Sequence, residues 1–292
     1  MSPSVSAVIP SRDEGGNLRR TVHALLATMP RDCEIVIVDD GSVDGSADFA
    51  GAAYPAVRVV RLERSVGPAA ARHAGAEEAA GELLLFADAH VIPQRGWFEA
   101  FSDALADDAV GAVGPAMADS DKPRLCGFGA TWRLPPLDLH WLPFRSREPQ
   151  EVPLLGGAFL AMRREVYSAC GGFDDGLIGW GGSDSELCAR LWMQGYSCLV
   201  VPTVAVAHRF RREATYPVDP ALVVHNFLRI GLVHLGADRL RCVVDHYRAQ
   251  PGADRALALL AAGDTYARRA AVRATRRHDD EWFFERFAPS AS

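Results

Sequence analysis

The sequence lacks the local patterns by which several common kinds of site are recognised. None of the six cysteines stands in a Cys-x-x-Cys pair, which argues against a zinc knuckle or a redox dithiol and favours buried free thiols. No Gly-x-Gly-x-x-Gly follows the first apolar run and no Walker loop occurs, so the usual backbone cradles for dinucleotides and triphosphates are missing. No apolar run approaches the roughly 20 residues that span a bilayer.

The composition is that of a globular protein. A chain of 292 residues that is 49% hydrophobic can bury a substantial core, either as one large domain or as two. The net charge of −6 gives no general attraction to nucleic acid. Because the N-terminus also lacks the charged and apolar regions of a signal peptide, we expect a soluble, cytoplasmic protein.

Short apolar runs alternate with helix-like segments along the first half of the chain. We expect strands at 5–9, 34–38, 57–62, 83–86 and 110–115, a glycine-led strand within 154–163 and a short strand pair at 198–207. We expect helices at 18–26, after Asp44, at 68–80, at 98–105 and from 183 to about 194. This alternation predicts an α/β fold with a mostly parallel twisted sheet flanked by helices.

Polar residues follow several of these predicted strands. Such sheets bind ligands outside the carboxyl ends of their strands, so residues 10–14, 39–42 and 88–90 are expected to face one crevice. Asp88 and His90 would project from one face if the chain stayed extended through Ala89. A carboxylate and an imidazole there make half of a metal site; the alternative is a strand end where Asp88 caps a turn and His90 is solvated.

A second imidazole follows the predicted strand pair at His208, and Arg211 lies just after it. Asp88, His90 and His208 together are predicted to hold one divalent cation, with phosphate oxygens and water as its other ligands and Arg211 neutralising the phosphates. Two imidazoles favour Mn²⁺ or a similar transition ion over Mg²⁺, which prefers oxygen ligands.

The glycine-rich stretch 179–182 leads into the predicted helix that starts at Ser183. Ser183 and Glu186 fit a capping box, which makes Glu186 a helix cap. Asp184 then lies in the first turn, where the helix dipole favours its ionised form, the form that accepts a proton from a hydroxyl group. Asp184 is therefore predicted to be catalytic, the alternative being an ordinary acidic residue at a helix start. Gly156 and Gly157 suit a close approach of the backbone to a ligand or to another strand.

Two further regions carry less specific signals. Residues 118–153 show little periodicity, and Trp132 and Trp141 there are either acceptor-groove residues or core anchors. From residue 217 onward helices are expected at 222–235, 240–247, 255–277 and 282–287. Arginines form a basic strip there, which is a solvated helix face or a contact for an anionic acceptor, a membrane surface or another subunit. The residues of this strip are Arg268, Arg269, Arg273, Arg276 and Arg277.

As an ordered set, the motifs resemble those of a GT-A glycosyltransferase of the family 2 type. They are Val-Ile-Pro at 8–10, Ile-Val-Asp-Asp-Gly-Ser at 37–42, Gly-Pro-Ala-Ala-Ala-Arg at 67–72, Asp-Ala-His at 88–90 and Gly-Trp-Gly-Gly at 179–182. In detail they are most similar to the catalytic domain of polypeptide N-acetylgalactosaminyltransferases, through Asp88, His90, Trp180, His208, Arg211 and Tyr216. The resemblance covers roughly residues 5–217.

The resemblance implies a catalytic domain at 1–216, with a nucleotide-sugar-binding half (1–117) and an acceptor half (118–216), followed by a helical region at 217–292. It implies a UDP-sugar donor, a UDP-N-acetylhexosamine or a UDP-hexose, a bridging Mn²⁺ or other divalent ion such as Mg²⁺, and uracil recognition by Asp39. Donor-binding residues would be Pro10, Arg12, Glu14, Asp39, Arg72, Asp88, Gly156, Gly157, Trp180, Arg211 and Tyr216. The acceptor hydroxyl belongs to a small molecule, a glycan, a lipid-linked group or a peptide.

The stereochemistry follows from one departure from this pattern. The N-acetylgalactosaminyltransferases have Glu-Asn where this chain has Ser183-Asp184, whereas inverting relatives place an acidic base at the position of Asp184. We therefore expect inversion, with retention as the alternative. Two other functions stay open: a nucleotidyltransferase, disfavoured by the missing glycine-rich, lysine-ended loop, and a non-catalytic nucleotide-sugar-binding protein, which would need neither Asp184 nor the complete metal set.

Overall fold

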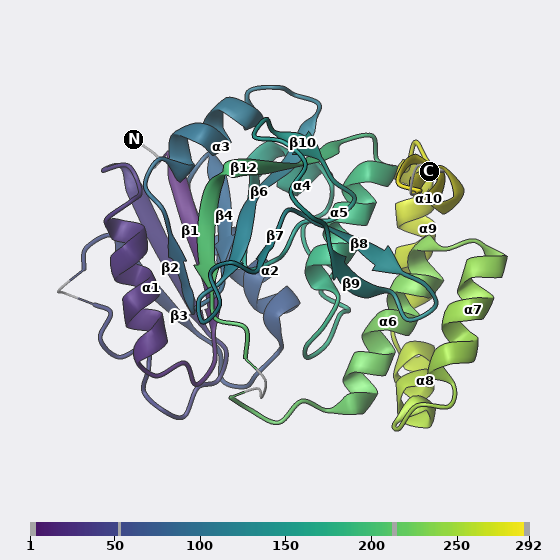
Figure 1. Cartoon of the computed structure of the whole chain (residues 1–292). Helices are drawn as coiled ribbons and strands as arrows, with labels where there is room; N and C mark the ends of the chain where they lie inside the picture. The colour runs from purple at the N-terminus through teal and green to yellow at the C-terminus, as the bar shows by residue number, and fades with distance from the viewer. Residues whose placement is uncertain (1–3, 52–53, 212–214, 289–292) are drawn as a thin grey trace.

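The computed structural model describes residues 4–51, 54–211 and 215–288. Strands and helices alternate along the chain, and most of the strands form one large sheet that helices cover on both faces. The sheet runs through the left and centre of Figure 1, and the C-terminal helices lie together on the right. Its strands are β1 (Val5–Ser11), β2 (Cys33–Asp39), β3 (Val57–Arg61), β4 (Leu83–Ala87), β5 (Val91–Pro93), β6 (Val110–Asp119), β7 (Cys126–Gly127), β10 (Gln150–Glu151), β11 (Phe159–Arg163) and β12 (Ser197–His208).

The strand order is β10-β12-β6-β11-β4-β1-β2-β3, with β5 beside β12 and β7 beside β6. The predicted α/β class is confirmed: β1, β2, β3 and β4 are parallel neighbours, and so are β6 and β12. The sheet is nevertheless mixed, because β11 is antiparallel to β4 and β6. As a result β11 begins at the edge where β4 ends, and this brings Gly156 and Gly157 next to Asp88, whose backbone N–H donates to Ala158.

Ten helices stand among the described residues. They are α1 (Gly16–Leu26), α2 (Pro68–Glu78), α3 (Trp97–Leu105), α4 (Arg164–Ala169), α5 (Ser183–Met193), α6 (Pro220–His234), α7 (Ala237–Tyr247), α8 (Ala253–Ala262), α9 (Thr265–Thr275) and α10 (Asp280–Arg286). The segment 118–153, predicted to be irregular, contains β7 and β10 and a separate hairpin of β8 (Ala130–Arg133) and β9 (Asp138–Trp141).

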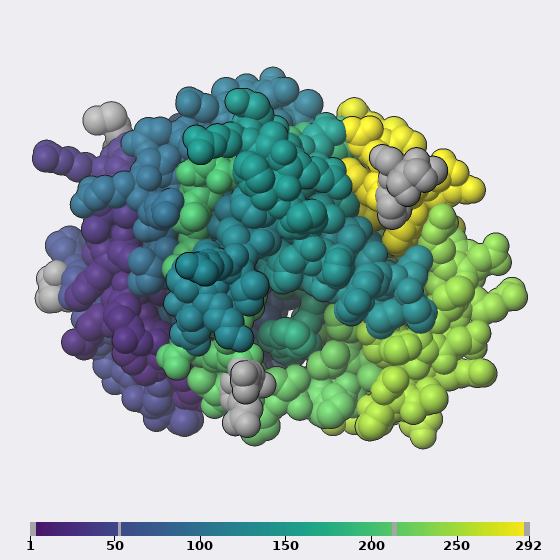
Figure 2. Space-filling view, viewed as in Figure 1, coloured from purple at the N-terminus to yellow at the C-terminus, as the bar shows by residue number. Residues whose placement is uncertain are grey.

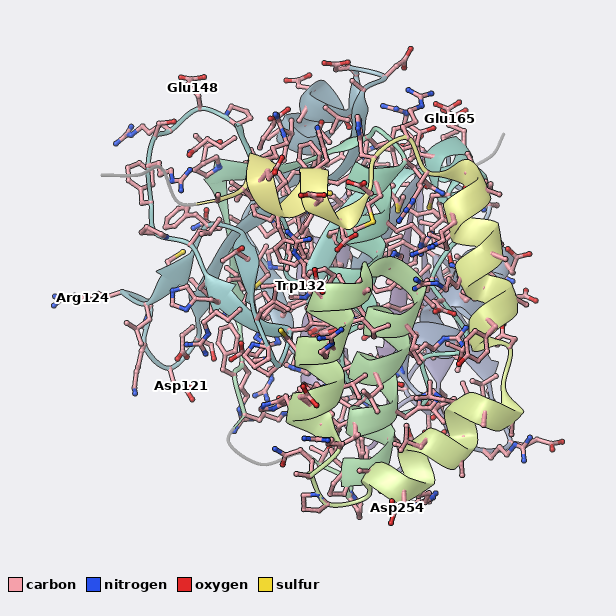
Figure 3. All side chains as sticks on the ribbon, turned by 90° about the vertical axis from the view of Figure 1, so that its right-hand side faces the viewer. Asp121, Arg124, Trp132, Glu148, Glu165 and Asp254 are labelled. Carbon is pink, nitrogen blue, oxygen red and sulfur yellow. The ribbon has the colours of Figure 1, made fainter. Side chains whose placement is uncertain are left out.

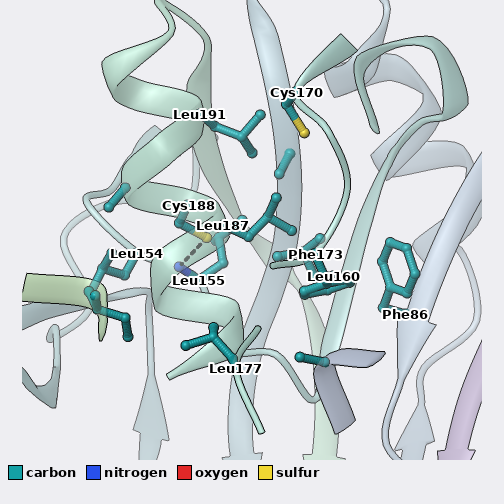
Figure 4. Close-up of a cluster of buried hydrophobic side chains, with 14 of the residues drawn as sticks. Phe86, Leu154, Leu155, Leu160, Cys170, Phe173, Leu177, Leu187, Cys188 and Leu191 are labelled. Carbon is teal, nitrogen blue, oxygen red and sulfur yellow. Dashed lines mark hydrogen bonds between the residues drawn. The ribbon is translucent and has the colours of Figure 1, made fainter. Parts of the chain in front are cut away.

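The strands are buried on both faces, which explains their unbroken apolar runs. In β4, Leu84 and Phe86 point to a core shared with α2, α4 and α5, while Leu85 and Ala87 point to a second core shared with α1 and α3. Figure 4 shows part of the first core, a cluster that includes Phe86, Leu160, Phe173 and Leu187 of α5. The alternating side chains therefore fix the register of the strand and the position of its polar end.

Three predicted elements differ in the structure. The helix expected after Asp44 does not form, because Asp44 accepts the backbone N–H of Ser46 in a local turn and Gly45 has a positive φ of 68°. The strand pair at 198–207 is the single long strand β12, which is interrupted by bulges. The predicted helix at 255–277 is divided into α8 and α9, because the chain turns at Gly263 and Asp264.

The C-terminal helices pack onto the rest of the chain. In Figure 3 Trp132 lies beside these helices, and its ring is 5.8 Å from that of Phe283 in α10. Trp132 is only 5% exposed, so it is a core anchor. Within the basic strip, Arg269 donates to the carbonyls of Leu232 and Leu235 at the end of α6, which is a helix-capping role.

No helix in the described ranges is both long and apolar enough to cross a membrane. The six cysteines are free thiols: three are buried, Cys33 and Cys126 are half-buried, and Cys242 is exposed.

Candidate functional site

A cleft of about 740 Å³ lies where β1, β4 and β12 end. It is lined by every predicted site residue except Asp39. Figure 2 shows the surface hollowed between residues from the middle of the chain and green residues near 220. The residues that line the cleft come from segments far apart in sequence, from Pro10 to Phe227, so the fold brings the predicted strand ends to one place.

Asp88, His90 and His208 form a cluster in this cleft. One potential ligand atom from each residue lies within 4.8 Å of the other two. Nε2 of His208 is 3.4 Å from Oδ2 of Asp88, and the two imidazole rings are 4.8 Å apart. The grouping agrees with the prediction, but the condition stated for it, an extended chain through Ala89, is not met. Residues 89–90 form a turn after β4, and β5 then pairs with β12 so that His90 returns toward His208.

The donor set of this cluster fits a divalent transition ion. Both ring nitrogens of His208 are buried, and neither has a hydrogen-bond partner among the residues that the structure describes. Buried polar atoms are normally satisfied, so these nitrogens point to a missing partner. Nδ1 of His90 contacts Oε1 of Glu14 at 3.2 Å, which leaves Nε2 available, as in metal-bound histidines that a carboxylate orients.

Two acidic groups here are held in their ionised form. Burial alone would raise the pKa of Asp88, but the close imidazole of His208 and the charges of Arg72 and His90 outweigh it and lower the pKa. Burial likewise opposes ionisation of Glu14, whereas its contacts with His90 and Arg211 lower its pKa. Asp88 is therefore a carboxylate, the form that binds a metal ion.

Arg72 connects the metal cluster to the glycine-rich stretch. Its guanidinium group is nearly buried and donates to Asp88 at 2.8 Å, to the carbonyl of Gly157 at 3.1 Å and to the hydroxyl of Ser183 at 3.1 Å. The planar guanidinium group of Arg72 thus holds three acceptors from three segments of the chain. The sequence predicted a donor-binding role for Arg72; the structure adds this bridging position.

Arg211 makes a different contact from the predicted one. It forms an ion pair with Glu14, in which Nη1 lies 3.0 Å from Oε1 and Nη2 contacts Oε2. Its predicted contact with phosphate stays a prediction. Arg12 stacks over Tyr216, with 4.7 Å between Cζ and the ring centre, and burial raises the pKa of Tyr216. Pro10, Arg12 and Tyr216 all line the cleft as predicted.

Asp39 is the one predicted site residue that is not among the residues lining the cleft, and its role in uracil recognition stays a prediction. Asp39 pairs with Arg61, its partner on β3, at 2.7 Å and accepts the backbone N–H of Ser42. The neighbouring Asp40 lines the cleft instead, and its carboxylate accepts the backbone N–H groups of Val66 and Gly67. Successive residues at a strand end point to opposite sides, and the pattern Asp-Asp alone does not tell which one faces the ligand.

Asp184 lies in the first turn of α5, as predicted, and lines the cleft. Its Oδ2 accepts the backbone N–H of Gly157 at 2.8 Å. A Cβ atom at Gly157 would lie 2.7 Å from Cβ of Asp184, so glycine is needed there for this approach. Trp180, which is 54% exposed, stands at the cleft mouth.

The predicted capping box at the start of α5 is wrong. The N-cap is Gly182, which has a positive φ of 82°, and no side chain caps the helix. Glu186 is instead fully buried and binds Arg190 at 2.8 Å and His234 of α6 at 2.9 Å. Burial would raise the pKa of Glu186, but the charge of Arg190 and the bond with His234 lower it. Glu186 therefore links α6, in the C-terminal region, to α5, the helix that carries Asp184.

Replacing Glu186 by glutamine is expected to lower the free energy of unfolding by about 3–5 kcal/mol, because Arg190 would keep a buried charge without its carboxylate. Urea unfolding at neutral pH measures this loss. Because the pKa is lower in the folded state, the contribution of Glu186 is complete above the ordinary glutamate pKa of about 4.3 and is lost as the pH falls below it. The difference in the free energy of unfolding between wild type and the variant should therefore become smaller at acidic pH.

The matched control is Glu165→Gln, since the exposed side chain of Glu165 also pairs with an arginine. A surface pair of this kind contributes about 0–1 kcal/mol. Equal urea midpoints for wild type and Glu186→Gln would show that the buried pair contributes nothing.

Two aromatic cleft residues, Phe210 and Phe227, were not singled out from the sequence. Trp141, one of the two tryptophans left open, lines the cleft together with Phe210 and Phe227. The rings of Trp141 and Phe210 are 6.0 Å apart. Phe227 comes from α6, far beyond the motifs, and an apolar residue in a predicted helix carries no sign that it borders a site.

Known proteins share this combination of fold and motifs. The chain is 29% identical over 260 residues to human polypeptide N-acetylgalactosaminyltransferase 15, an alignment that covers 80% of this chain and 40% of that protein. It is 31% identical over 263 residues to polypeptide N-acetylgalactosaminyltransferase 11 of Xenopus tropicalis, with 82% and 43% covered. The chain thus spans about two fifths of the length of these relatives.

Among solved structures, the fold is similar to that of GalNAc-T7 determined with UDP, GalNAc and Mn²⁺. The TM-score is 0.79 at 24% identity, covering 98% of this chain and 57% of the other. The model for the N-terminal domain of galactosyltransferase matches residues 146–213. The model for glycosyl transferase family 2 matches residues 6–171, which is more than half of the chain, and the chain therefore belongs to glycosyl transferase family 2.

Proposed function

We propose that this protein is a metal-dependent glycosyltransferase that moves a sugar from a UDP-sugar to an acceptor hydroxyl. The observation that carries the proposal is the cluster of Asp88, His90 and His208 in the cleft. One carboxylate and two imidazoles suit Mn²⁺. When bound there, such an ion would offset the negative charge that develops on the departing diphosphate.

The donor is proposed from the relatives. Two of them are named as N-acetylgalactosaminyltransferases, and the similar structure of GalNAc-T7 contains UDP, GalNAc and Mn²⁺. These similarities support a UDP-N-acetylhexosamine, with a UDP-hexose as the nearest alternative. Arg12, Tyr216 and Arg72 line the cleft, and they are the residues we assign to donor binding together with Pro10, Gly156 and Gly157.

Asp184 is proposed as the general base of an inverting transfer. Its carboxylate lines the same cleft as the metal cluster, and it accepts only one hydrogen bond, from Gly157, among the described residues. The carboxylate can therefore accept a proton from the attacking hydroxyl. The similarity to polypeptide N-acetylgalactosaminyltransferases favours retention as a second candidate. The anomeric configuration of the first product, read by NMR, decides between them.

Release of UDP from a panel of UDP-sugars tests the function. Slow release in the presence of Mn²⁺ that stops on addition of a chelator supports a transferase. Formation of UTP from the UDP-sugar and pyrophosphate would instead indicate a nucleotidyltransferase. Binding of UDP-sugars without any turnover, with and without candidate acceptors, would leave only a binding protein. Peptide hydroxyls are the first acceptors to test, because the relatives are named as polypeptide transferases.

Replacing Arg72 by lysine is expected to weaken Mn²⁺-dependent UDP binding by about 10- to 100-fold, the usual cost of losing a residue that orients a metal ligand. Lysine keeps the charge, but one ammonium group cannot bind Asp88, Gly157 and Ser183 in the geometry of the planar guanidinium group. Calorimetric titration with UDP and Mn²⁺ measures the effect. Arg58→Lys is the control, because Arg58 pairs with Glu78 at the surface; an Arg72→Lys variant that binds like this control would contradict the assigned role.

A further inference from the structure

Helix α6 packs directly against the glycine-rich segment that borders the cleft. We call residues 178–184 the Trp180 segment. A Cβ atom at Gly179 would lie 2.9 Å from Leu222, and one at Gly182 would lie 2.5 Å from Ile230. The glycines of this segment therefore permit the close approach of α6 as well as the backbone turns at positive φ.

One buried side chain of α6 binds the backbone of this segment at three points. Asn226 is 0% exposed. Its amide nitrogen donates to the carbonyls of Gly181, at 3.1 Å, and Trp180, at 3.4 Å, while its oxygen accepts the N–H of Ile178 at 3.0 Å. The next residue, Phe227, lines the cleft itself.

The same helix also supports a second part of the cleft lining, the β8–β9 hairpin. The ring of Phe227 stacks on Tyr247 of α7, with 5.7 Å between centres and an angle of 4°. The hydroxyl of Tyr247 donates to the carbonyl of Pro136 at 2.6 Å, in the turn of the β8–β9 hairpin. The hairpin contributes Leu137, Leu139 and Trp141 to the cleft. Thus α6 and α7 together contact two segments that line the cleft.

We propose that Asn226 is a positioning residue for the reaction: it holds the Trp180 segment so that Trp180 and Asp184 keep their places in the cleft. The expected effect on turnover rests on the proposed function. The inference goes beyond that function because α6 lies outside both segments matched by family models, residues 6–171 and 146–213. The helical region would then be a part of the catalytic unit.

The physical reason is that, among the described residues, Asn226 makes the only hydrogen bonds to the backbone of residues 178–181. Gly179, Gly181 and Gly182 all have positive φ, and glycine gives the unfolded segment more freedom than any other residue. Hydrogen bonds from a buried amide are strongly directional and remove this freedom. A displacement of about 1 Å at a reacting group can lower a rate by about 100-fold.

Hydrogen exchange and turnover of Asn226→Ala and Asn226→Asp test the proposal. Both variants lose the donors to Trp180 and Gly181, and only the aspartate keeps an acceptor for Ile178. We expect faster exchange in peptides covering 178–184 for both, with the Ile178 amide more protected in the aspartate variant. Mn²⁺-dependent UDP affinity should stay within a factor of three of wild type, while UDP release from the best UDP-sugar falls by about 10- to 100-fold.

Val233→Ala is the matched control, because Val233 is a fully buried residue of the same helix with no polar side-chain atoms. It should lower the melting temperature without faster exchange at 178–184 and without loss of turnover per folded molecule. Unchanged exchange in both Asn226 variants overturns the proposal. Faster exchange with wild-type turnover also overturns it, because Asn226 would then be structural only. If wild type itself releases no UDP, the proposed function fails, and exchange alone decides whether Asn226 holds the segment.

Discussion

Replacing His208 by alanine is expected to abolish Mn²⁺-dependent binding of UDP and to leave the chain folded. His208 supplies one of only three side-chain ligands in the cluster. Losing a residue that merely orients a ligand costs about 10- to 100-fold in affinity, so the loss of a ligand should cost at least about 100-fold. Because neither ring nitrogen makes a hydrogen bond in the described chain, the substitution removes only the 3.4 Å contact of Nε2 with Asp88 and the packing of the ring.

Calorimetric titration of UDP with Mn²⁺ and with chelator measures this effect, and thermal unfolding followed by circular dichroism checks the fold. The control is His140→Ala, which removes an exposed imidazole from β9 and should bind as wild type does. A His208→Ala variant with wild-type Mn²⁺ affinity would remove His208 from the site. The cluster would then be a structural group at the end of β12.

Asp184→Asn is expected to bind the donor normally and to lose transfer by about 100- to 10,000-fold, the usual contribution of a general base. Asparagine keeps an oxygen that can accept the N–H of Gly157, so the backbone contact that Asp184 makes at 2.8 Å should survive. What is lost is the negative charge and the ability to take up a proton. Single-turnover transfer and UDP affinity, measured on the same preparation, separate the chemical step from binding.

Asp175→Asn is a suitable control, because Asp175 is exposed in the loop before the glycine-rich stretch and does not line the cleft. If Asp184→Asn turns over at a rate near wild type, Asp184 is not the base. That result combined with a product of retained configuration would support the second candidate, the retaining mechanism.

The strands and the metal cluster were predictable for related reasons. Unbroken apolar runs such as Leu83–Phe86 indicate strands buried on both faces, and the rule that ligands bind at the carboxyl ends brings their polar neighbours together. His208 was predictable because it directly follows another strand. The path of the chain around His90 was not predictable, because the turn at residues 89–90 and the pairing of β5 with β12 depend on long-range contacts.

The remaining differences come from tertiary packing. Glu186 fits a helix cap by spacing, but it is drawn inward by Arg190 and His234, and His234 lies 48 residues away. Asp39 pairs with Arg61 on the adjacent strand, and its neighbour Asp40 lines the cleft. Phe227 and Asn226 lie in a helix whose apolar pattern shows burial but does not identify the segment it is buried against.

The ion pair between Arg72 and Asp88 has a thermodynamic consequence for the cleft. The single carboxylate of the cluster already shares its charge with a guanidinium group, and the two imidazoles bring no negative charge when they act as ligands. A free cation should therefore bind weakly until a diphosphate adds its own oxygens and charge. Binding of the two ligands is thermodynamically linked: the nucleotide raises the affinity for the ion by the same factor by which the ion raises the affinity for the nucleotide. Each ligand is therefore expected to saturate the protein only in the presence of the other.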